Sequence, residues 1–237
     1  MKPAFATLSG SLLLAIASAA PAADHLLLRA DFNHLAPGDS PGNGGAEAGE
    51  PVQDGGMLVG GPPLSTPNLQ IRDMSDCCAV HTRFEFLGGE ELTHGTVQLR
   101  ANVLFTGDAG PTFGIREQGS SATTFLNVYS ANGSAFLGYA GSTYLGMIGA
   151  APSDVVLPLA IDVSAEHRLV SVRVGETTWI DRAEIDLSTT RGVGAFIVGV
   201  LHNPALSDDV MRMDDVRVVA CESPEFADCL LVAGFEG

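Results

Sequence analysis

The chain has 237 residues, and its 28 acidic side chains outnumber its 12 basic ones to give a formal net charge of −16. This acidity argues against nucleic acid and anionic lipid as partners, because both bind basic surfaces. The length suits a single all-β domain with one large core, which we expect over residues 24–220.

Residues 1–23 are predicted to form a secretory signal peptide. Lys2 precedes an apolar run over residues 8–20, and small side chains follow at the expected cleavage region. The run is shorter than the roughly 20 apolar residues that span a membrane. We therefore expect an exported protein without a membrane span.

Alternation of apolar and polar side chains predicts strands along most of the chain. An apolar strand is expected at 26–32, and a Gly- and Pro-rich excursion through residue 63 is expected to hold one short strand at 57–59. Residues 185–191 are the one place where a short helix or turn is expected. Further strands are expected at 80–86, 97–105, 112–116, 123–129, 135–139, 157–163, 170–174, 177–180, 192–201 and 211–219. Short strands separated by turn residues indicate a sandwich or barrel.

Four cysteines in an exported chain can oxidise, with three possible pairings. Cys221 and Cys229 are close in sequence, so we expect them to form a local disulfide in a C-terminal tail, residues 221–237. Cys77 and Cys78 are adjacent, and either they bond each other or one of them reaches the tail. Zinc is disfavoured because adjacent thiols lack the usual ligand spacing.

The apolar opening strand and the closing Asp215-Val216-Arg217-Val218 strand resemble the first and last strands of concanavalin A-like jelly rolls. This superfamily includes legume lectins, laminin-G-like domains and laminarinases. The hairpin that carries Trp179 also resembles a late hairpin of laminin-G-like domains. The resemblance implies an all-β, two-sheet antiparallel jelly roll.

A structural calcium site is implied by the same resemblance. Asp214 matches an aspartate that helps to bind calcium in laminarinase-like domains, and Asp31 occupies the acidic place before a Phe-Asn pair. Calcium prefers several oxygen ligands, which terminal strands that meet in space can supply. The alternative is that Asp214 and Asp215 form a solvated or arginine-paired strand end.

No catalytic residue is predicted. Laminarinases carry two glutamates on one strand, but here Glu184-Ile185-Asp186 begins that motif without a second glutamate and lies late in the chain. A lyase would need a Tyr or His base beside Arg and Gln or Asn. His81, Gln98, Arg100 and Tyr129 could supply such groups, although the longer strand motifs of alginate lyases are absent.

Carbohydrate binding is the expected function, because aromatic faces and planar polar groups hold sugars. Tyr144 lies with two further tyrosines in one region rich in Gly, Ser and Asn. The alternative is that these side chains only cap the core or line the wet side of a strand. The candidate ligand-binding residues are Gln98, Arg100, Asn102, Tyr129, Tyr139 and Trp179.

The sequence thus predicts a non-catalytic carbohydrate-binding or surface-recognition domain, secreted, periplasmic or on the cell surface, with a polysaccharide or cell-surface glycan as its partner. A polysaccharide-active enzyme of the same fold and a structural or adhesion protein are the alternatives. The ending Gly234-Phe235-Glu236 resembles endings of exported proteins of some Gram-negative bacteria, which indicates a bacterial origin.

Overall fold

A computed structural model describes twelve stretches of the chain, beginning at His25. The expected signal peptide, the adjacent Cys77 and Cys78, and the segment 186–191 lie outside these stretches. The described residues are 25–41, 46, 48–53, 56–72, 80–106, 110–119, 124–132, 135–185, 192–201, 210–223, 225–226 and 229.

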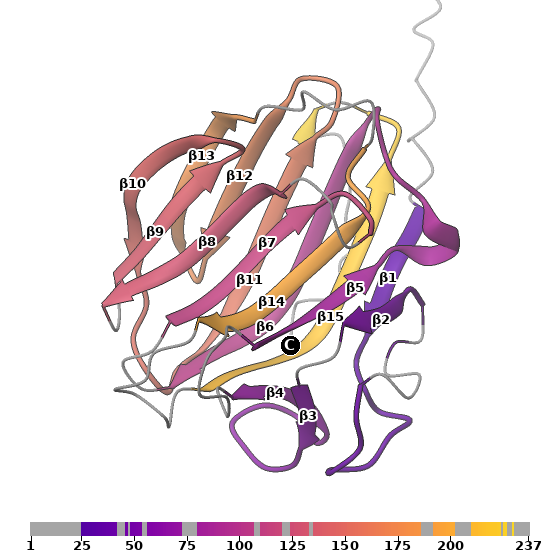
Figure 1. Cartoon of the computed structure of the whole chain (residues 1–237), viewed down its shortest axis with the longest axis vertical. Helices are drawn as coiled ribbons and strands as arrows, with labels where there is room; N and C mark the ends of the chain where they lie inside the picture. Colours follow the sequence, from indigo (N-terminus) through magenta and orange to yellow (C-terminus); the bar gives the residue numbers. More distant parts are fainter. Residues whose placement is uncertain are drawn as a thin grey trace, which may run out of the picture.

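The described residues form two antiparallel sheets stacked face to face, as Figure 1 shows. The eight-stranded sheet has the order β13 (Thr177–Glu184), β12 (Leu169–Val174), β11 (Val156–Ser164), β6 (Thr96–Thr106), β15 (Val210–Cys221), β4 (Asn68–Arg72) and β3 (Gly56–Val59), and β1 (His25–Ala30) also pairs with β15. The seven-stranded sheet has the order β10 (Thr143–Ala150), β9 (Ala135–Ala140), β8 (Thr124–Asn132), β7 (Gly110–Arg116), β14 (Ala195–Leu201), β5 (Val80–Glu85) and β2 (Glu50–Gln53). The predicted two-sheet jelly roll is confirmed.

A 3-10 turn spans Leu87–Gly89. A helix long and apolar enough to cross a membrane is absent from the described stretches. Most expected strands are present within a few residues of their predicted bounds, but β2, β4 and β10 were not predicted.

The core fills the space between the two sheets and explains the alternation in the sequence. Side chains from both inner faces are fully buried, among them Phe84 and Phe196 from one sheet and Leu99 and Val218 from the other. Each alternates along its strand with a residue on an outer face. The period-two pattern therefore sorts side chains into core and outer faces.

Trp179 belongs to this core, which corrects its assignment to a ligand site. Its side chain is 6% exposed, and its ring centroid lies 4.7 Å from that of Phe136 on the opposite sheet. A Cβ added at Gly149 would lie 2.5 Å from the indole ring. The tryptophan thus fills the space between β13 and β10 and presents no face to a ligand.

A bulge interrupts β15 and lets it pair with two strands along one edge. Residues 210–213 pair with β4, the register shifts between Asp214 and Arg217, and residues 216–220 pair with β1. Asp215 has a φ of 52°, a left-handed conformation that aspartate tolerates better than most residues. The Asp-Asp pair of the closing strand therefore marks the bulge.

Candidate ligand-binding face

The outer face of the seven-stranded sheet gathers aromatic side chains at one end and charged ones at the other. We call it the seven-stranded face. Its members alternate with buried core residues on six neighbouring strands. They include His81, Arg83 and Glu85 from β5, Ile197 and Gly199 from β14, Thr112, Gly114 and Arg116 from β7, Asn127 and Tyr129 from β8, Leu137 and Tyr139 from β9, and Tyr144 and Met147 from β10.

Three tyrosines form a continuous aromatic surface across β8, β9 and β10. The rings of Tyr129 and Tyr139 are stacked, with centroids 6.0 Å apart and planes 17° apart, and the centroid of Tyr144 lies 5.0 Å from that of Tyr139. Tyr144 is 54% exposed and the neighbouring Met147 is 74% exposed. Desolvation first, and then a side-chain hydrogen bond with Tyr139, raise the pKa of Tyr129, so its hydroxyl is protonated at neutral pH.

Two glycines and three residues with side chains lie between the tyrosines and the charged end. Gly114 of β7 pairs with Ile197 on one side and with Asn127 on the other, and Asn127 pairs with Tyr139. Gly199 of β14 pairs with both His81 and Thr112. Both glycines are buried, and the side chains between the two ends are those of Ile197, Thr112 and Asn127, with the Thr112 hydroxyl donating to Asn127 Oδ1 at 3.1 Å.

The charged end is built by β5 and the end of β7. The carboxylate Oε1 of Glu85 lies 3.3 Å from Nη2 of Arg83, and it also accepts a hydrogen bond from the Gly119 N–H at 3.2 Å. Burial first, and then the positive charges of Arg116 and Arg83, lower the pKa of His81 below its ordinary value of 6.5. The imidazole is therefore neutral at neutral pH, beside two guanidinium groups.

The polar trio expected from the sequence lies on the opposite side of the molecule, on the outer face of β6. Arg100 Nη1 is 2.7 Å from Asp162 Oδ1, and the Asn102 amide donates to Asp215 Oδ2 at 3.0 Å. Gln98 is 3% exposed. All three side chains thus lie against neighbouring groups of the eight-stranded sheet or the tail.

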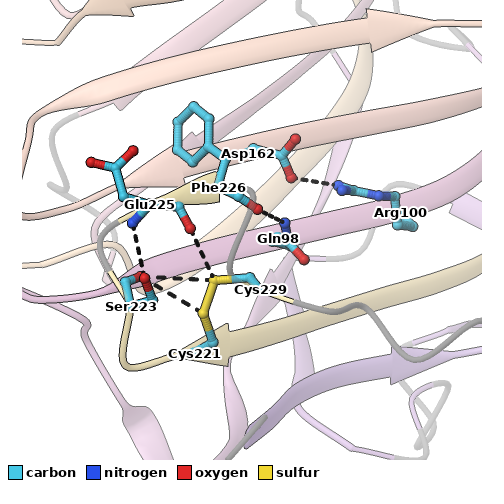
Figure 2. The surroundings of a disulfide bond; sticks show 8 residues. All are labelled: Gln98, Arg100, Asp162, Cys221, Ser223, Glu225, Phe226 and Cys229. Atoms are coloured by element: carbon cyan, nitrogen blue, oxygen red, sulfur yellow. Dashed lines mark hydrogen bonds and ion pairs between the residues drawn. A yellow bond between two sulfur atoms is a disulfide. The ribbon is translucent and has the colours of Figure 1, made fainter. Parts of the chain in front are cut away.

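The C-terminal loop covers part of that opposite face, as Figure 2 shows. The predicted disulfide joins Cys221 and Cys229. The loop it closes carries Phe226, whose carbonyl accepts a hydrogen bond from Gln98 Nε2 at 3.4 Å and whose ring lies 5.4 Å from the Arg182 guanidinium carbon. This contact reduces access to Gln98.

The structure therefore does not bring the predicted ligand residues together. Tyr129 and Tyr139 lie on the seven-stranded face, Arg100 and its neighbours lie on the opposite outer face, and Trp179 lies between the sheets. Arg83 and Arg116 lie on the same outer face as the tyrosines, a placement that was not predicted from the sequence. The alternation of polar and apolar residues shows that both arginines face away from the core, but it does not show which strands belong to the same sheet.

Asp31 and Asp214, the predicted calcium ligands, lie on paired terminal strands or directly after them. Asp31 accepts hydrogen bonds from Arg29 Nη2 at 2.6 Å and from the Asn33 N–H at 3.1 Å. Asp214 is 1% exposed and accepts hydrogen bonds from Ser65 Oγ and from the Asp215 N–H. Across the described stretches, no three His, Cys, Asp or Glu side chains are placed to hold a metal ion. The carboxylate oxygens of Asp31 and Asp214 accept hydrogen bonds from protein groups. The calcium site therefore stays a prediction.

A hollow of about 520 Å³ lies apart from both outer faces, where β1 and β15 meet the start of β6. His25 Nε2 lies 3.1 Å from Glu90 Oε2 at its wall, and both side chains are about half exposed. Cys221 of the disulfide also lines it. It lacks both a row of aromatic rings and a buried charged group, so it is the weaker candidate.

Comparison with known proteins supports the fold. No protein-family model and no curated protein sequence matches the chain. Among solved structures, a β-glucanase catalytic domain from Podospora anserina has 12% identity and a TM-score of 0.55 over 84% of this chain and 98% of its own. Lectin II from Ulex europaeus has 12% identity and a TM-score of 0.52 over 73% of this chain and 96% of its own.

Sialidases match over a smaller share of their own length. Trypanosoma rangeli sialidase in complex with sialic acid has 12% identity and a TM-score of 0.54 over 81% of this chain, but the chain spans only 30% of that protein. It spans 18% of another sialidase, at 10% identity and a TM-score of 0.52. These matches agree with the topology, and the chain has the concanavalin A-like fold shared by lectins and glucanases.

Proposed function

We propose that the protein is a carbohydrate-binding domain and that its ligand lies along the seven-stranded face. The observation that carries this proposal is the row of Tyr129, Tyr139 and Tyr144, which offers adjacent aromatic surfaces and is open to solvent at β10. Aromatic faces pack against the C–H surfaces of sugar rings, and tyrosine hydroxyls bind sugar hydroxyls. The lectin and glucanase names of the similar structures agree with a glycan ligand.

Binding without hydrolysis is the favoured form of this proposal. Glycoside hydrolysis uses two carboxyl groups about 5 to 10 Å apart across the scissile bond. Of the described side chains that alternate onto the seven-stranded face, Glu85 is the only carboxylate, and Oε1 of that group already contacts Arg83 and the Gly119 N–H. A carboxylate held in this way serves to orient Arg83.

The test is retention of the purified protein on a panel of insoluble and gel-embedded polysaccharides, with calcium present. Tyr139→Ala is expected to weaken retention about tenfold, the usual cost of removing a central aromatic side chain from an interface, whereas Tyr139→Phe keeps most of it. Phe226→Ala, on the opposite face, is the matched control and leaves retention unchanged. If Arg100→Ala abolishes retention and Tyr139→Ala does not, the ligand binds the eight-stranded sheet and the proposal is wrong.

A polysaccharide-active enzyme is the second candidate, and His81 is the observation that favours it. Its lowered pKa gives a neutral imidazole that can accept a proton at neutral pH, next to Arg83 and Arg116. The test is the chain length of each retained polysaccharide after long incubation. Shortening that His81→Gln abolishes supports the enzyme. Unchanged length supports the binding domain.

A further inference from the structure

Arg83 is an unusual cation because the fold buries it on an outer face. It is 9% exposed, and its Nε atom is buried without a hydrogen-bond partner within the described part of the chain. Its Nη2 contacts a single carboxylate oxygen, that of Glu85. Burying a charged group with incomplete hydrogen bonding costs free energy, so the position favours a further anionic partner.

The guanidinium of Arg116 interacts electrostatically with that of Arg83. Burial first, and then the positive charge of Arg83, lower the pKa of Arg116, while the negative charges of Glu117 and Glu85 oppose this effect. Burial is the largest cause of the lowered pKa of His81, and the positive charges of Arg116 and Arg83 lower it further. Arg83, Arg116 and His81 therefore form one basic cluster, in a chain in which acidic side chains outnumber basic ones by 28 to 12.

Arg83 of the basic cluster shares one cross-strand row with Tyr139 and Tyr144. Arg83 pairs with Ile197, Ile197 with Gly114, Gly114 with Asn127, Asn127 with Tyr139, and Tyr139 with Tyr144. Residues paired directly across strands project from the same face. At about 4.8 Å for each strand, four strand spacings put Tyr139 roughly 19 Å from Arg83. A ligand that reaches both ends must be a chain of several sugars.

We propose that the seven-stranded face selects acidic polysaccharides, with an anionic group of one sugar bound by Arg83 and Arg116 and the sugars further along the chain packed on Tyr139 and Tyr144. This inference rests on the proposed carbohydrate-binding function. A guanidinium binds a carboxylate or a sulfate ester through paired hydrogen bonds.

The experiment compares matched pairs of polymers that differ only in charge. Polygalacturonate is tested against its fully methyl-esterified form, and dextran sulfate against dextran, by equilibrium binding at low salt. The expected result is binding to one charged polymer at least tenfold tighter than to its neutral partner, and the pair that shows this difference tells carboxylate from sulfate. The charged polymer is expected to lose affinity as sodium chloride is added.

Variants separate the two ends of the row. Arg116→Gln is expected to lower affinity for the charged polymer about tenfold and to leave any binding of the neutral one unchanged, whereas Tyr139→Ala lowers both. Arg168→Gln removes an exposed arginine from the turn between β11 and β12 and is the matched control with no effect on either polymer. Circular dichroism and thermal unfolding establish that each variant is folded.

Two other outcomes have different meanings. Equal binding of charged and neutral polymers, both weakened by Tyr139→Ala, overturns the acidic preference and leaves the carbohydrate-binding function standing. Binding of no polymer on this panel or on the wider one overturns both. If Arg168→Gln weakens the charged polymer as much as Arg116→Gln does, the preference is a property of overall charge and the basic cluster is not its site.

Discussion

Asp214 is a carboxyl group that the fold buries at the bulge of β15. Burial raises its pKa above 3.8, hydrogen bonds from Ser65 and the Asp215 N–H partly offset this effect, and the negative charge of Asp215 adds to it. A carboxyl with a raised pKa binds its proton more tightly in the folded state. Its contribution to stability is therefore largest at low pH and falls as the pH rises from about 4 through the folded pKa.

The variant Asp214→Asn is expected to remove this dependence. Asparagine stays neutral, so the difference in free energy of unfolding between the natural chain and the variant should move in favour of the variant as the pH rises from 3 to 7. Urea unfolding at several pH values, in the presence of a chelator, measures it. If calcium binds Asp214 as the sequence resemblance implies, adding calcium at pH 7 raises the melting temperature of the natural chain and not of the variant. A parallel pH profile for both proteins contradicts the assignment of the titration to Asp214.

His81 is expected to make the binding of acidic polysaccharide depend on pH. Because its pKa lies below 6.5, it is neutral at pH 7.5 and gains its proton only on further acidification. Carboxylates of the ligand stay ionised there, since ordinary carboxyl pKa values are near 4. The charged groups beside it are Arg83 and Arg116, and Glu85 contacts Arg83. Affinity should therefore rise as the pH falls from 7.5 to below 6.5, and the rise should vanish in His81→Gln. Titration calorimetry checks this, and an equal rise in both proteins would assign the effect to a group other than His81.

At the scale of single elements, the C-terminal loop is held to the eight-stranded sheet mainly by the disulfide. The Glu225 carboxylate lies 3.1 Å from His167 and 3.7 Å from Arg182, but all three side chains are between 41% and 51% exposed. Exposed ion pairs of this kind contribute little. The covalent link between Cys221 and Cys229, eight residues apart, restricts the unfolded chain instead.

Replacing both cysteines, Cys221→Ser with Cys229→Ser, is expected to lower the free energy of unfolding by about 2 to 3 kcal/mol, because the loop closure is lost from the unfolded state. Guanidinium unfolding measures the difference. Polysaccharide binding is expected to remain, since the loop covers the opposite outer face. Treating the natural protein with a reductant should give the same loss. A stability equal to that of the oxidised protein would mean that the loop is held by its other contacts.

The contact between β10 and β13 depends on a glycine. Gly149→Ala would place a methyl group 2.5 Å from the indole of Trp179, and overpacking of a core costs roughly 1 to 3 kcal/mol. Gly138→Ala on the adjacent strand is the matched control, because its methyl group would meet the flexible side chain of Ile148 at 3.0 Å. Thermal unfolding should show a larger decrease in melting temperature for Gly149→Ala than for Gly138→Ala. Equal decreases would mean that the contact between Gly149 and Trp179 is not unusually tight.

Local patterns in the sequence were enough to predict β5, β6 and β15, because their apolar residues alternate over a long stretch. They were not enough for β10, whose Gly146 and Gly149 resemble turn residues although the strand pairs with β9. The candidate site failed for a different reason. Arg100 and Tyr129 each alternate correctly with core residues, but pairing between distant strands decides that they lie on opposite faces.

At the scale of the whole molecule, one core is shared by both sheets, so we expect the domain to unfold cooperatively. Trp179, the only tryptophan, lies in that core. Its fluorescence and far-ultraviolet circular dichroism should therefore change at the same denaturant concentration. A saturating polysaccharide should leave the emission wavelength unchanged, because the indole is buried away from the seven-stranded face. A shift on binding would contradict this placement, and separate transitions would mean that the sheets unfold independently.

The pairing of the first strand with the last has a consequence for the connectivity of the fold. His25 at the start of β1 is paired with Ala220 near the end of β15, so the two ends of the sandwich are neighbours in space. A short linker could close the backbone into a ring, and the ring could be cut at the exposed turn that contains Gly175, between β12 and β13. Such a circular permutant would begin at a different residue but keep every strand pair and both outer faces. The fold would then not depend on the order in which the strands are synthesised.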